Sequence, residues 1–199
     1  MAEPRKTVTA LRSAGRCRVC VELDGEPWRV LPLEPVVRAG LREGVVLDRA
    51  RLRELARELR RARALGVAGR ALARRDLSEQ RLRERLDRAG IAPAGREEAV
   101  GTLRRAGLVD DERFACARAA ALAERGLGDA AIRFELEGQE IPATALEAAL
   151  AGLEPERDRA QSIVSRRGGG AATARYLARR GFAEDVVEAA ANASVASDR

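Results

Sequence analysis

The chain of 199 residues is long enough for one domain or two, and none of its segments resembles a membrane span or a cleavable signal. Hydrophobic residues make up 46% and charged residues 34%, which excludes wholesale disorder, and the Ala, Leu, Arg and Glu bias favours helix. The formal net charge is +6, and histidine, the commonest general base and metal ligand, is missing. We therefore expect a soluble, cytoplasmic, mainly helical protein.

Positive charge is concentrated in one part of the chain. Residues 49–90 hold 14 Lys and Arg against 6 Asp and Glu, whereas residues 1–48 hold 8 against 7 and residues 91–199 hold 15 against 18. A net charge of +8 on one helical region is typical of a surface that binds a polyanion or an acidic protein. Because Lys6 is the sole lysine, a genomic preference for arginine accounts for the same pattern, and a charge run is often only a solvated face.

The first 48 residues have the pattern of a small antiparallel sheet. Residues 7–11 and 16–23 alternate apolar and polar side chains, and Asp24 and Gly25 form a hairpin signal before a Pro-interrupted stretch that ends at residue 35. We predict a β-rich N-terminal subdomain over residues 1–48 that leans on the first helix, because so short a segment buries little by itself.

The first helix is predicted to begin after Asp48, a good N-cap residue. Leu47 and Leu52 flank this cap in the arrangement of a hydrophobic staple. Gly66 and Gly69 are expected to break or bend the helix before it resumes.

The stretch from Leu77 to Ala115 contains a helical unit that recurs twice at a period of roughly 50 residues, which is typical of stacked helical repeats. We divide residues 49–199 into three units, at about 49–109, 110–153 and 154–193. In each unit a glycine or its equivalent ends one helix and an apolar residue follows. The expected core positions are Leu82, Leu86 and Ile91, then Ile132, Leu136 and Ile141, then Thr173, Leu177 and Phe182.

Such units bury their apolar faces only against neighbours. We therefore predict a mainly α fold, an elongated stack of three tandem three-helix repeats, curved to the right or to the left, after the small β-rich subdomain. A curved stack presents a long concave surface to partners. The glycines at 168–170 are expected to form a flexible joint within the last unit.

The sequence lacks the patterns of an enzyme. No GxxxxGK[ST] phosphate loop is present. Cys17 and Cys20 have CxxC spacing, but the predicted strand sends them to opposite faces and no second ligand pair exists, so reduced structural thiols are favoured over a zinc or redox site. Asp110, Asp111 and Glu112 could imitate a metal cluster, but the start of a helix explains them as caps. We expect no enzymatic activity, no cofactor and no metal.

Three segments of the sequence carry a family resemblance: LARRDLSEQRLRERLDRAGI, LRRAGLVDDERFA and GLGDAAIRFELEGQEI. In this order they resemble the RecX family of bacterial recombination regulators, and the N-terminal VTALRSAGRCRVCVELDGEPWRVL is similar to the strand-rich extension of many members. The second unit departs from the family pattern. Gln139 and Glu140 stand where the family usually places a basic residue and glycine, which weighs against the left-handed helix ending expected there.

The resemblance implies a regulator of homologous recombination, DNA repair and the SOS response. It implies that the chain, which we expect to be a monomer, binds the RecA recombinase filament in its helical groove and inhibits ATP hydrolysis and strand exchange. From their exposure on the predicted helices, we name candidate contacts to RecA or DNA. They are Arg83, Arg88, Arg104, Arg105, Arg118, Arg133, Arg175, Tyr176, Arg179 and Arg180.

Two alternatives remain at this point. The chain could be a stand-alone DNA-binding helical repeat protein, or the strand-rich start could be a separate binding domain with the helices as its scaffold. Aromatic residues make up only 3% of the chain, and Phe114, Phe134 and Phe182 are expected in the core. Stacking platforms for single strands are therefore scarce, and we expect DNA contacts to be weak, salt-sensitive and non-specific.

Overall fold

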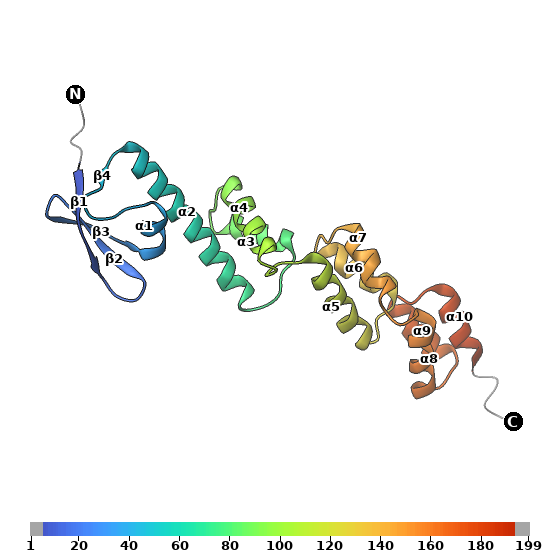
Figure 1. The fold of residues 1–199 in the computed structure, drawn as a ribbon. Helices are drawn as coiled ribbons and strands as arrows, with labels where there is room; N and C mark the ends of the chain where they lie inside the picture. Colours follow the sequence, from blue (N-terminus) through green and yellow to red (C-terminus); the bar gives the residue numbers. More distant parts are fainter. Residues whose placement is uncertain (1–5, 194–199) are drawn as a thin grey trace. The chain divides into compact units, whose positions relative to one another are not determined.

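The computed structural model describes residues 6–193, which form a four-stranded sheet followed by helices to the end of the described chain (Figure 1). These residues divide into two compact units. One extends from the start of the described chain to Arg74 and includes Arg85–Thr102; the other contains Arg75–Glu84 and the chain from Leu103 onward. The predicted mainly helical class with an N-terminal antiparallel sheet is confirmed. The curvature of the stack and the limits of its repeats stay predictions.

The sheet has the order β3-β2-β1-β4, and all of its neighbouring strands are antiparallel. Asp24 and Gly25 connect β2 to β3 with φ values of 52° and 89°, the left-handed conformation that two-residue hairpin turns favour. One face of the sheet closes over a core that contains Val8, Val21 and Leu23. The strands are β1 (Lys6–Ser13), β2 (Arg18–Leu23), β3 (Glu26–Pro32) and β4 (Val46–Leu47).

A short helix, α1 (Leu33–Arg38), follows β3, whereas the Pro-interrupted sequence predicted only sheet. Proline is tolerated in the first turn of a helix, where its missing N–H would have no helical partner, so Pro35 does not prevent helix formation. Glu34 and Arg38 form an ion pair at 2.8 Å one turn apart, and Val36 is fully buried in the core. Burial of Val36 explains why this Pro-containing segment folds onto the sheet as a helix.

Helix α2 (Arg49–Leu72) is continuous, so the predicted break at Gly66 and Gly69 is wrong. Glycine inside a helix costs only about 1 kcal/mol relative to alanine. Ala64 and Ala68 lie on one face of this stretch and are almost wholly buried, so packing outweighs the weak propensity of the glycines.

The structure confirms the predicted N-cap of α2 but not the predicted hydrophobic staple. The Asp48 carboxylate accepts a hydrogen bond from the Arg51 N–H at 2.8 Å, which confirms it as the N-cap. Leu47 and Leu55 are buried, but Leu52 is 40% exposed, so Leu52 is not part of the core as the staple predicted.

Eight further helices complete the described chain, and the second helix of each predicted repeat ends in the same way. The N–H groups of Ile91, Ile141 and Phe182 donate to carbonyl groups five residues earlier, at 3.1, 3.3 and 3.2 Å. This bond is characteristic of a Schellman ending. The helices are α3 (Glu79–Arg88), α4 (Pro93–Arg105), α5 (Asp111–Glu124), α6 (Asp129–Gly138), α7 (Ala143–Ala151), α8 (Glu156–Arg167), α9 (Ala171–Arg179) and α10 (Glu184–Asn192).

Glu140 takes the left-handed conformation, which glycine adopts at the equivalent positions of the other two repeats. Its φ is 54°, close to 70° at Gly90 and 76° at Gly181, although a side chain is unfavourable there. The prediction that Gln139 and Glu140 disfavour a left-handed ending at this position is therefore wrong. Burial of Ile141 after the turn fixes the chain direction, and the strain at Glu140 is tolerated.

We expect Glu140→Gly to stabilise the protein by about 0.5 to 1 kcal/mol, because glycine removes the left-handed strain. Gly90→Ala should destabilise by about 1 kcal/mol for the opposite reason. Gly138→Ala is the control: its added Cβ meets nothing within 4 Å, and its φ is not positive, so it should be neutral or slightly stabilising. Urea denaturation measures all three, and a destabilised Glu140→Gly variant would contradict the interpretation.

Candidate partner-binding surface

Two junctions join helices of different repeats and so position the side chains on them. The first junction is built on Ser78. This residue is fully buried at the start of α3. Its hydroxyl donates to the Gln139 carbonyl oxygen at 2.9 Å and accepts from the Arg81 N–H at 3.2 Å. The Arg81 guanidinium also donates to the Gly138 carbonyl. The beginning of α3 therefore binds the carbonyl groups at the end of α6.

The second junction repeats this arrangement one unit later with glycine in place of serine. The Gly128 N–H donates to the Arg180 carbonyl at 2.8 Å, and the Ala130 N–H donates to the Gly181 carbonyl at 3.2 Å. A Cβ on Gly128 would lie 2.3 Å from the Gly181 oxygen. Only glycine allows the start of α6 to approach the end of α9 so closely.

Each junction is supported by one carboxylate from the start of another helix, α5 for the first junction and α8 for the second. Asp111 accepts from the Glu79 N–H at 2.8 Å, and Glu156 accepts from the N–H groups of Asp129 and Ala183 at 2.6 and 3.2 Å. Carboxylates are favourable at helix N-termini. The predicted capping role is confirmed for Asp110, which accepts from its own helix at 3.0 Å, but Asp111 serves a different helix.

Burial raises the pKa of the Asp111 carboxyl above its ordinary value, although the hydrogen bond from Glu79 opposes this rise. The carboxylate is half-buried, so its charge loses part of its hydration in the folded state. The junction therefore holds a charged acceptor at some cost to stability at neutral pH.

Arg159 joins α8 to the second junction, a role that no sequence pattern predicted. Its side chain is only 8% exposed. It donates to the carbonyl groups of Glu154 and Leu127 at 2.9 and 2.8 Å, pairs with Asp129, and lies 5.9 Å from the centre of the Phe182 ring. A buried arginine with this many partners is structural and is not available to a ligand.

Several of the predicted candidate arginines are engaged in ion pairs. Arg83 pairs with Glu79 at 2.9 Å, and Arg104 approaches the same carboxylate at 3.6 Å, so the structure brings these two candidates together. Arg88 and Arg105 are the last residues of α3 and α4 and have exposed side chains.

Two more candidates flank the outer face of α6. Arg118 of α5 pairs with Glu135 at 2.6 Å. Arg133 makes a two-pronged pair with Glu147 of α7, whose pKa is lowered by the hydrogen bond from this arginine. A partner would have to compete with these carboxylates for either arginine.

Phe134 lies between these two ion pairs and is 78% exposed, so its predicted core position is wrong. Ile132 and Leu136 of the same helix are fully buried, and a residue two positions from each points to the other side of a helix. Phe182 is buried as predicted, and Phe114 packs partly buried against the core of α5–α7.

The remaining candidates lie on α9 and at Arg180, the residue that follows it. Arg175 and Arg179 are exposed, whereas Tyr176 is half-buried between two guanidinium groups. Arg167 and Arg180 lie 4.2 and 5.0 Å from the centre of its ring. The stack restrains both arginines and covers the ring, so Tyr176 is not an open stacking platform.

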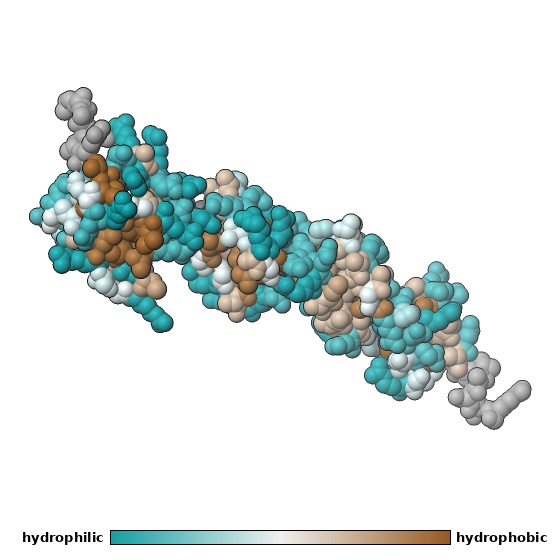
Figure 2. All heavy atoms as spheres, in the orientation of Figure 1, coloured by the Kyte–Doolittle hydropathy of each residue, from teal (hydrophilic) through white to brown (hydrophobic). Residues whose placement is uncertain are grey.

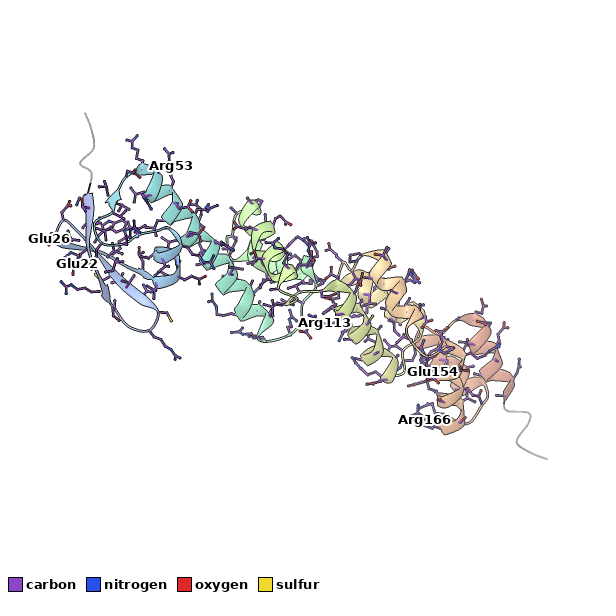
Figure 3. The ribbon with its side chains drawn as sticks, in the orientation of Figure 1. Glu22, Glu26, Arg53, Arg113, Glu154 and Arg166 are labelled. Atoms are coloured by element: carbon purple, nitrogen blue, oxygen red, sulfur yellow. The ribbon has the colours of Figure 1, made fainter. Side chains whose placement is uncertain are left out.

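The segment of sequence that contains this stack is rich in arginine. Residues 160–183 contain five arginines and no Asp or Glu, a local concentration that the charge of the whole C-terminal half conceals. A shallow pocket lies beside it between α5 and α8, bordered by Arg166 and by the carboxylates of Glu124 and Glu154. Figure 3 shows Arg166 near the end of α8 and Glu154 just before its start.

The N-terminal sheet carries a separate apolar surface. Val30 of β3 and Leu33 and Val37 of α1 are 45%, 45% and 63% exposed. Figure 2 shows a hydrophobic patch over this part of the chain. Cys17 precedes β2 with a φ of 58° and so lies in a turn, not in the predicted strand, while Cys20 lies within β2.

Neither a membrane-spanning helix nor a group of three or more potential metal ligands occurs among residues 6–193. The described thiols are all free.

The chain matches no family model, but it is similar to proteins named Regulatory protein RecX. The protein of Xanthomonas axonopodis pv. citri is 36% identical over 138 residues, which cover 64% of this chain and 83% of the relative. The protein of Stenotrophomonas maltophilia is 34% identical over 138 residues, which cover 64% of this chain and 82% of that relative.

Two solved structures share the fold. One, described as the crystal structure of regulatory protein RecX, aligns with a TM-score of 0.78 at 18% identity over 92% of this chain and 97% of that one. The crystal structure of RecX from Lactobacillus salivarius aligns with a TM-score of 0.59 at 15% identity, over 68% of this chain and 96% of that one.

We expect Gly128→Ala to destabilise the protein by about 2 kcal/mol or more, because the new methyl group would overlap the backbone of Gly181, which cannot rotate away. Thermal unfolding followed by circular dichroism measures the loss. Gly69→Ala in α2, where a Cβ meets nothing within 4 Å, is the matched control and should be neutral or stabilising. Equal stability of both variants would show that the junction is not tightly packed.

The pKa of Asp111 gives a pH-dependent prediction. Because its folded pKa lies above the ordinary 3.8, the ionised form destabilises the folded state at neutral pH, and this cost disappears as pH falls through the folded pKa. Asp111→Asn keeps an acceptor without the charge, so its stability relative to the parent should be more favourable at pH 7 than near pH 4. Urea denaturation at both pH values measures this difference.

Asp111→Ala serves as the comparison, because it also removes the acceptor for the Glu79 N–H and should therefore be about 1 kcal/mol less stable than Asp111→Asn at either pH. If Asp111→Asn gains stability relative to the parent on acidification, the buried-charge explanation is wrong.

Proposed function

We propose that this chain, which belongs to the RecX family, regulates homologous recombination by binding the RecA filament and restraining its ATP hydrolysis and strand exchange. The observation that carries the proposal is the match to relatives named Regulatory protein RecX, which this chain covers over 83% of their length in the first case. RecA is the partner that the family resemblance implies.

The two junctions support this role physically. They fix the start of α3 to the end of α6 and the start of α6 to the end of α9 by hydrogen bonds between buried or closely packed groups. Side chains on these helices are therefore presented in a fixed spacing. Modest contacts from successive helices to a repeating filament add through effective concentration.

The candidate contacts differ in how readily they meet a partner. Arg175 and Arg179 extend from α9 with exposed side chains and are the first candidates for steering toward acidic surfaces or DNA. Arg83, Arg118 and Arg133 would exchange an existing carboxylate for one on the partner. The full proposed set is Arg83, Arg88, Arg104, Arg105, Arg118, Arg133, Arg175, Tyr176, Arg179 and Arg180.

A second candidate function is stand-alone DNA binding, and one observation favours it. The arginine-rich, carboxylate-free stretch 160–183 could neutralise phosphate groups directly. Such binding would weaken steeply with salt and would not require RecA.

RecA's DNA-dependent ATP hydrolysis on preformed filaments, measured while this protein is titrated in, tests the proposal. We expect hydrolysis to fall at substoichiometric amounts under salt conditions in which the protein scarcely binds the same DNA alone. Anisotropy of labelled DNA without RecA provides the second measurement.

The Arg175→Ala/Arg179→Ala variant should require several-fold more protein for the same inhibition, because it removes two exposed charges and each exposed charge pair contributes up to about 1 kcal/mol. Arg38→Ala on α1 is the exposed control. Unchanged hydrolysis, or a fall only at concentrations that coat the DNA, would replace the filament proposal with the DNA-binding one.

A further inference from the structure

The exposed ring of Phe134 lies outside the hydrophobic core of its own repeat. An aromatic side chain can bury about 150 to 250 Å² of largely apolar surface, and Phe134 is 78% exposed. Isolated exposed apolar residues are common, so exposure alone decides nothing. The surroundings of the ring carry the inference.

Helix α6 holds the ring in a fixed place. Ile132 and Leu136 anchor the helix in the core on the opposite side. Glu135 is tied to α5 through Arg118, and Arg133 is tied to α7 through Glu147. The residues before and after Phe134 are therefore both restrained. A ring on such a preorganised helix loses little conformational freedom when it is buried by a partner.

Three of the four residues one helical turn from Phe134 are small, and the fourth is Glu137. Ala130 and Ala131 lie one turn before it and Gly138 one turn after it, and an added Cβ on Gly138 would meet nothing within 4 Å. Figure 2 shows a moderately hydrophobic surface over α6 and α7, where further exposed alanines occur. Small residues around one large ring let a partner's surface approach closely enough to enclose it.

The charge of this region selects the class of partner. Residues 129–156 contain seven Asp and Glu and a single arginine, Arg133, which pairs with Glu147. Arg118 and Arg159, from outside this segment, pair with two more of its carboxylates, and the other four leave the region acidic. Glu137, three residues from Phe134, is exposed and acts electrostatically on Arg133. A carboxylate-rich border repels the phosphates of a nucleic acid and complements basic side chains of a protein. Stacking of a nucleic-acid base on Phe134 is therefore disfavoured.

We propose that Phe134 is the anchor of a protein-docking face on α6, and that its ring enters an apolar pocket bordered by basic side chains on the partner. The inference rests on the proposed function, since it assigns this face to the same filament protein, RecA. An aromatic anchor inside a polar rim is the usual form of an interaction hot spot.

The test compares the full chain with Phe134→Ala and with Leu108→Ala, whose side chain is 59% exposed outside α6. Binding to RecA filaments assembled on single-stranded DNA, with this chain fluorescently labelled, should weaken about tenfold or more for Phe134→Ala and less than about twofold for Leu108→Ala. Alanine is a better helix former than phenylalanine, so thermal unfolding should show no loss of fold. Phe134→Gln, at the same site, should weaken binding as Phe134→Ala does.

The outcomes separate the two proposals. If the parent chain does not bind the filament, the proposed function fails and this assignment with it. If the parent binds and both Phe134 variants bind equally well, only the assignment fails. Loss of binding to bare DNA by Phe134→Ala would show base stacking instead. Self-association of the parent that Phe134→Ala abolishes would assign the face to a second copy of the chain.

Discussion

The close approach of one helix start to another helix end is the constraint on which the C-terminal compact unit depends. At Gly128 and Gly181 the two backbones meet with no room for a side chain, and at Ser78 a buried hydroxyl spans the corresponding gap to Gln139. Unpaired N–H groups at a helix start and unpaired carbonyl groups at a helix end each need partners, and here they supply one another. Polar groups that every helix leaves unsatisfied thus become the contacts between repeats.

Much of the fold could be predicted from sequence because periodicity reports burial. The positions equivalent to Leu86, namely Leu136 and Leu177, are all fully buried, as the repeat alignment indicated. The errors have a common origin in local rules that tertiary packing overrides. Gly66 lies within a continuous helix because its alanine neighbours are buried, and Glu140 accepts a conformation that the following apolar residue imposes.

The candidate surface was less accessible to sequence reasoning. Phe134 was assigned to the core from residue type, although its spacing from Ile132 and Leu136 already placed it on the opposite helix face. The long-range partners of Asp111, Arg159 and Ser78 lie 32, 30 to 32 and 61 residues away, and no local pattern specifies contacts at that distance. The Arg167–Tyr176–Arg180 stack was likewise invisible, although the carboxylate-free stretch around it could have been found by counting charge in shorter windows.

The two junctions have the same plan but different chemistry, and this fixes the order of the repeats. At the first, a serine side chain reaches across to a carbonyl group; at the second, the N–H group of Gly128 itself makes the contact. A repeat moved to the other position would bring a serine to a gap that accommodates only glycine, or leave a glycine facing a carbonyl group beyond its reach. The repeats therefore share a plan but are not interchangeable. A recombinant chain with shuffled or duplicated repeats would need its junction residues exchanged along with them.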